Sequence, residues 1–127
     1  MILLWLDDIR NIHQDEGWIV FSPIPKYDLT EIVWVKSYKE FVKHIEKYGL
    51  PDGICFDHDL ADEHYTNDIN PNDYQEKTGY DCAKWLINYC MDNNEPLPKW
   101  NVQSANPSGK ANINGLLNNF KEKMILE

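Results

Sequence analysis

Basic residues are scarce in this sequence. It has 12 lysines and arginines against 21 aspartates and glutamates, so its formal net charge is -9. A protein that binds duplex nucleic acid needs a basic face for the phosphates, so this composition argues against such a partner. The acidic excess suits a soluble protein, and it is consistent with carboxylates gathered around a cation.

Long apolar runs are also missing. No run approaches the roughly 20 residues that a membrane-spanning helix needs, so we expect no membrane partner. The apolar stretch 2–6 is followed at once by Asp7 and Asp8, which is unlike a signal peptide.

Cysteine is limited to Cys55, Cys82 and Cys90, an odd number without the spacing of a metal site. We interpret the three as reduced core residues of a cytoplasmic protein. No repeat, low-complexity tract or linker interrupts the 127 residues, which predicts a single domain over 1–127.

Three short strand-like runs, at residues 2–6, 53–56 and 100–103, each end in polar side chains. The first is followed by Asp7-Asp8, the second by Asp57-His58-Asp59 and the third by the segment Ser104 to Lys110. In open α/β sheets, ligands bind at the carboxyl ends of the strands. The sequence therefore predicts a functional site where these polar segments meet.

Helix signals alternate with these runs. Ser37 and Glu40 form a capping box before a helix that ends at Gly49, Thr78 begins a second helix, and either Asn106 or Ser108 caps a third. Residues 31–36 alternate like a strand, and residues 17–21 could form another. Strands that alternate with helices predict a three-layer α/β fold, with a mainly parallel sheet covered on both faces.

The aspartates after the first two runs are candidate metal ligands. Asp7, Asp8 and Asp57 would repel one another at one sheet edge unless a cation or protons lie among them. Hard oxygen ligands suit a divalent cation, and Mg²⁺ or Mn²⁺ is the expected cofactor. The alternative is that one aspartate of each pair caps a turn and the others are solvated.

The segment after the third run is a candidate anion site, because a hydroxyl, a helix amino terminus and a lysine suit a phosphate. The predicted phosphate-binding residues are Ser104, Asn106, Ser108, Lys110 and, from the first acidic loop, Arg10. Asn106 could instead shape the turn before the helix, and Lys110 could be solvated.

His58 is the candidate acid or base, because imidazole transfers protons near neutral pH. Asp57 and Asp59 are further catalytic candidates. The alternative is a histidine in the second layer, hydrogen-bonded to backbone. By strand alternation His58 would point away from Asp57 and Asp59 if the strand continued that far. His64 could enter the site instead.

The segments LWLDD, FDHDL and VQSA resemble the signature sites of response-regulator receiver domains. In receivers an acidic pair binds Mg²⁺, an aspartate after the third strand is phosphorylated, and a Ser or Thr ends the fourth strand. Asp7-Asp8, Asp57 and Ser104 match these positions in order. The resemblance implies a flavodoxin-like sheet of strand order 2-1-3-4, truncated because the fifth strand and its lysine have no counterpart.

A closer resemblance is to the cyclic-phosphate processing receiver domain, carried by LWLDDIR, EGW, FDHDL, TGYDCAKWL and VQSANPSGKANI. It implies a metal-dependent phosphoesterase acting on a cyclic phosphate or cyclic nucleotide, in phage and bacterial defence settings. Two other hypotheses stay open: a module that binds such a ligand without cleaving it, and a degenerate receiver with Asp57 as phosphoacceptor.

Overall fold

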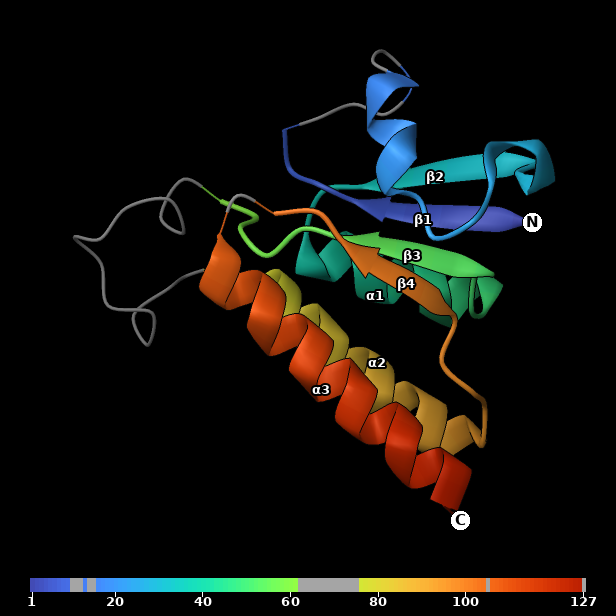
Figure 1. Cartoon of the computed structure of the whole chain (residues 1–127), viewed down its shortest axis with the longest axis vertical. Coiled ribbons are helices and arrows are strands. Elements are labelled where there is room, and N and C mark those ends of the chain that lie inside the picture. The colour runs from blue at the N-terminus through green and yellow to red at the C-terminus, as the bar shows by residue number, and fades with distance from the viewer. Residues whose placement is uncertain (10–12, 14–15, 62–75, 105, 127) are drawn as a thin grey trace.

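The computed structural model describes residues 1–9, 13, 16–61, 76–104 and 106–126. Within these residues, four parallel strands form one sheet in the order β2-β1-β3-β4 (Figure 1). The strands are β1 (Ile2–Leu6), β2 (Glu31–Val35), β3 (Gly53–Phe56) and β4 (Lys99–Val102). The predicted fold class and the predicted order 2-1-3-4 are confirmed.

The strands pair in a register that places their middle residues side by side. Trp5 of β1 pairs with Trp34 of β2 and with Cys55 of β3, and Cys55 pairs with Asn101 of β4. The carboxyl ends of all four strands therefore meet at one edge of the sheet, and the segments that leave them begin close together in space.

The three described α-helices cover one face of the sheet: α1 (Tyr38–Tyr48), α2 (Gly79–Asn93) and α3 (Pro107–Leu126) (Figure 1). Alternate residues of each strand point into this layer, as the two-residue period of a strand requires. Leu4 and Leu6 of β1, for example, share one core with Phe41 of α1 and Leu117 of α3. Cys82 and Cys90 of α2 are buried in the same core.

The opposite face is covered by two short 3-10 helices, η1 (Glu16–Phe21) and η2 (Lys26–Asp28), and their connections. Leu3, Trp5 and Cys55 form the core there, with Ile19 and Leu29 packed against it. The strand considered at 17–21 was wrong. Ile19 packs on the face of the sheet while Val20 is exposed, so the segment lies outside the strand ladder and its β-forming residues adopt a helical turn instead.

The predicted helix starts are confirmed by their hydrogen bonds. The Glu40 N–H donates to Ser37 Oγ (3.2 Å), and the Thr78 N–H donates to Asp81 Oδ2 (2.9 Å). At α3 the Gly109 N–H donates to Asn106 Oδ1 (2.9 Å), so Asn106, not Ser108, is the capping residue. None of the helices in the described part of the chain has the length and apolar character of a membrane span.

Candidate functional site

Three carboxylates lie together at the carboxyl edge of the sheet. Asp7 and Asp8 follow β1 and Asp57 follows β3, and one oxygen from each lies within 4.8 Å of the other two. Asp7 is 1% exposed and Asp57 is 5% exposed, which is unusual for carboxylates unless they are paired or bind a metal. Three hard oxygen donors at this spacing are consistent with a receiver-type divalent cation site.

Asp7 is held by side chains that come from β2 and from the segment that follows β4. Its Oδ2 accepts a hydrogen bond from Gln103 Nε2 (3.1 Å), and its backbone oxygen accepts one from the Trp34 indole N–H (2.7 Å). Gln103 is itself buried, at 4% exposure. The sequence analysis placed Gln103 in the third strand-like run but missed this role. A buried polar residue at the end of a strand was the available signal.

Asp57 has a perturbed acidity. Burial is the largest cause that raises its pKa, the charges of Asp7, Asp8 and Asp59 raise it further, and the combined effect brings the pKa to about 8. A hydrogen bond from the Asp59 backbone acts in the opposite direction. A divalent cation among the three clustered carboxylates would offset their repulsion and favour the ionised form, so the donor set fits such an ion.

His58 and Asp59 form a pair next to this cluster. His58 Nδ1 lies 2.8 Å from Asp59 Oδ1, and their side chains are 17% and 8% exposed. If the Asp59 carboxylate accepts a hydrogen bond from Nδ1–H, the lone pair of a neutral ring lies on Nε2. Because β3 ends at Phe56, strand alternation does not extend to these residues.

Two glycines let other segments approach this pair closely. The Gly79 N–H donates to the His58 carbonyl (2.8 Å), and a Cβ at Gly79 would overlap the Asp57 carbonyl oxygen. A Cβ at Gly109 would lie 2.7 Å from His58 Cδ2 and closer still to Cγ. The imidazole ring of His58 therefore lies directly against the first turn of α3.

The other predicted phosphate-binding residues cluster around the start of α3. Ser104 Oγ accepts a hydrogen bond from the Asn106 N–H (3.1 Å), and Ser108 and Lys110 are exposed in the first turn of the helix. Their roles as phosphate ligands stay predictions. Arg10 and His64 lie outside the described residues.

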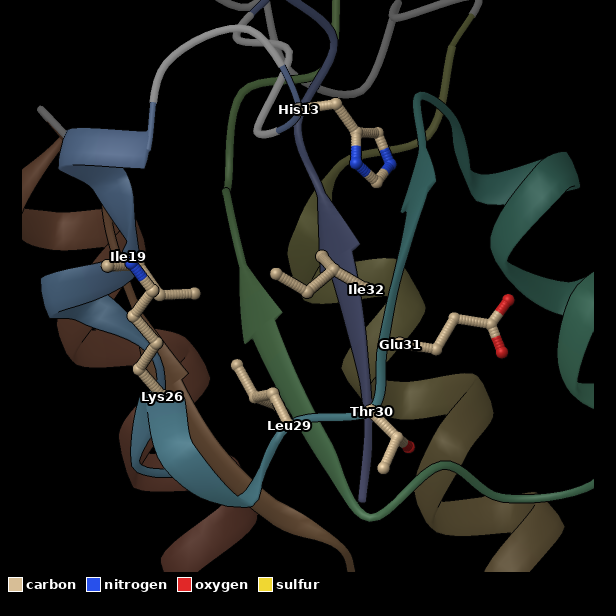
Figure 2. Close-up of a pocket in the computed structure, with 7 residues that line it drawn as sticks. All are labelled: His13, Ile19, Lys26, Leu29, Thr30, Glu31 and Ile32. Atoms are coloured by element: carbon tan, nitrogen blue, oxygen red, sulfur yellow. The ribbon is translucent and has the colours of Figure 1, made fainter.

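A separate cavity of about 310 Å³ lies on the face of the sheet that η1 and η2 cover (Figure 2). Ile19, Leu29 and Ile32 line it, together with Lys26 and His13. In Figure 2, His13 projects near the carboxyl ends of the strands while the apolar side chains lie further along the sheet. None of the three clustered aspartates lines this cavity, so it is distinct from the site predicted from the sequence.

Comparisons with known proteins agree with this geometry. No curated protein and no solved structure matched the chain. The family model of the cyclic-phosphate processing receiver domain matches residues 2–119, which include the clustered aspartates, the His58–Asp59 pair and most of α3. The chain therefore belongs to the cyclic-phosphate processing receiver domain family.

Proposed function

We propose that this protein is a divalent-cation-dependent phosphoesterase that hydrolyses a cyclic phosphate, most simply that of a small cyclic nucleotide. The observation that carries the proposal is the cluster of Asp7, Asp8 and Asp57, whose oxygens lie within 4.8 Å of one another beside the His58–Asp59 pair. The family name supports a cyclic phosphate as the substrate class.

Asp7, Asp8 and Asp57 would hold the cation. When bound, Mg²⁺ or Mn²⁺ would offset the negative charge of the phosphate and so favour attack by a nucleophile. Gln103 would keep the Asp7 carboxylate in place through its hydrogen bond to Oδ2.

His58 would transfer the proton. Its Nε2 lone pair accepts a proton from the attacking water while the water oxygen forms a bond to phosphorus and one ester bond of the ring breaks. The same proton then passes to the leaving oxygen, so the product is an open phosphate monoester. Asp59 holds Nδ1–H and thereby keeps the lone pair on Nε2.

The start of α3 would bind the phosphate oxygens. The positive end of the α3 dipole would attract the phosphate, and Lys110 adds a positive charge there. Ser104 and Ser108 would contribute hydroxyl groups. Arg10 remains a candidate for the same role.

A panel of 2′,3′- and 3′,5′-cyclic mononucleotides, incubated with Mg²⁺, Mn²⁺ or EDTA, tests the proposal. At least one member should be hydrolysed in the presence of metal and none in EDTA, and Asp57→Asn and His58→Ala should both abolish turnover. Asp92→Asn is the matched control, because this exposed aspartate of α2 lies outside the acidic cluster.

Tight binding of a cyclic nucleotide without cleavage would contradict the catalytic proposal and favour a binding module. Calorimetry with the same panel detects that outcome. If the parent cleaves a substrate and His58→Ala does so at the same rate, His58 is structural and the base lies elsewhere, with His64 as the next candidate.

A further inference from the structure

We propose that Asn106 is a positioning residue that ties the His58–Asp59 pair to the first turn of α3. This inference replaces the phosphate-binding role predicted for Asn106 from the sequence. Its kinetic test rests on the proposed function, whereas its spectroscopic test does not.

The two amide atoms of Asn106 have different partners. Oδ1 accepts a hydrogen bond from the Gly109 N–H (2.9 Å), and Nδ2 donates a longer one to Asp59 Oδ1 (3.4 Å). An N–H group requires an acceptor and a carboxylate requires a donor, so only one orientation of the amide satisfies both contacts. With both atoms engaged inside the protein, the amide is poorly placed to bind a ligand.

The Asp59 oxygen that receives Nδ2 is the same oxygen that faces His58 Nδ1 (2.8 Å). Asp59 is 6% exposed, so solvent does little to hold its carboxylate in one orientation. The Asn106 amide also donates to this oxygen and helps to fix it, and the fixed oxygen in turn determines which ring nitrogen of His58 carries the hydrogen.

The contact of Asn106 with Gly109 constrains the same histidine from another direction. The His58 ring lies against Gly109, where a Cβ would come within 2.7 Å of Cδ2. Capping by Asn106 holds Gly109 in the first helical turn. Asn106 therefore constrains the His58 ring in two ways, at Nδ1 through Asp59 and at Cγ and Cδ2 through Gly109.

Replacing Asn106 with serine separates its role as the cap of α3 from its role as a donor to Asp59. Serine caps helices about as well as asparagine, so the melting temperature should change little. A serine hydroxyl is too short to contact Gly109 N–H and Asp59 at once, so the donor to Asp59 is lost. We expect kcat to fall about tenfold or more, because hydrogen bonds to charged groups are worth at least that factor, while KM stays within about twofold.

The spectroscopic readout is the tautomer of His58, measured from its ¹⁵N chemical shifts at a pH where those shifts themselves identify a neutral ring. The parent should show the form protonated at Nδ1, and Asn106→Ser should shift the population towards the form protonated at Nε2. Asn119→Ser is the matched control: it makes the same substitution at an exposed position of α3 and should change neither kcat nor the tautomer.

An unchanged tautomer in Asn106→Ser overturns the inference. A raised KM at unchanged kcat also overturns it and returns Asn106 to the phosphate-binding residues. If the parent cleaves no cyclic phosphate, the proposed function fails, and the tautomer measurement alone decides the role of Asn106.

Discussion

Replacing Asp57 with asparagine should stabilise the protein at high pH. Asp57 is 5% exposed and lies among other carboxylates, which raises its pKa from 3.8 to about 8. Between those pH values the folded protein binds a proton that the unfolded chain has lost. The free energy of unfolding therefore falls as the pH rises from about 4 to about 8. Above about pH 8 it includes the full cost of ionising Asp57 in the folded protein.

The magnitude follows from the size of the shift. A pKa raised from 3.8 to about 8 lowers the free energy of unfolding above pH 8 by on the order of 5 kcal/mol, at about 1.4 kcal/mol for each tenfold change in proton affinity. Asparagine carries no charge at any pH, and its side-chain oxygen can still accept the hydrogen bond from the Asp59 backbone. Asp57→Asn should therefore be more stable than the parent by several kcal/mol at high pH and about equally stable near pH 4.

Urea denaturation in EDTA at both ends of this pH range measures the effect, with Asp92→Asn as the control for loss of one exposed charge. Mg²⁺ should stabilise the parent at high pH and should stabilise Asp57→Asn much less, because one of the three oxygens in the cluster is no longer charged. A stability difference between Asp57→Asn and the parent that is the same at both pH values would refute the reasoning, as would a less stable variant at high pH.

Three further substitutions test individual contacts. Gly109→Ala should displace the His58 ring and lower kcat, and a Gly109→Ala variant with the parent's kcat would contradict the close packing of Gly109 against His58. Gly115→Ala is the control on the same helix: its added methyl group lies in open space, so it should raise the free energy of unfolding by up to about 1 kcal/mol. Gln103→Leu should lower the free energy of unfolding by about 1–3 kcal/mol in urea titrations, because it removes the hydrogen bond from Gln103 Nε2 to the buried Asp7 carboxylate; unchanged stability would show that the bond contributes little. Lys110→Ala should leave the melting temperature nearly unchanged but weaken calorimetric binding of a cyclic nucleotide by about 1–3 kcal/mol, and equal affinity would remove Lys110 from the phosphate site.

Much of the fold could be predicted because its signals are local. The N-cap at Ser37 and the acid at Asp81 each act within one turn of helix, and both form as predicted. The strand order required only alternation of strands and helices and the resemblance to receivers. Residues 17–21 were harder, because an apolar segment that packs on the face of a sheet has the same composition as a strand within it.

The site could be predicted only as far as topology determines it. Parallel strands bring their carboxyl ends to one edge, which was enough to expect Asp7 and Asp57 close together. The contact of Gln103 with Asp7 and the approach of Gly109 to His58 join residues far apart in the chain. Such contacts depend on side-chain geometry that no sequence period encodes, so they were not foreseen.

The last prediction concerns the phosphoacceptor chemistry of receivers, in which the aspartate after the third strand attacks a phosphoryl donor. Receivers support that reaction with a lysine after a fifth strand, and the sheet of the described residues ends at β4. Acetyl phosphate with Mg²⁺ should therefore leave the intact mass of the protein unchanged. A phosphoryl adduct that Asp57→Asn abolishes would contradict this prediction and would assign the acidic cluster to receiver-type signalling instead of cyclic-phosphate hydrolysis.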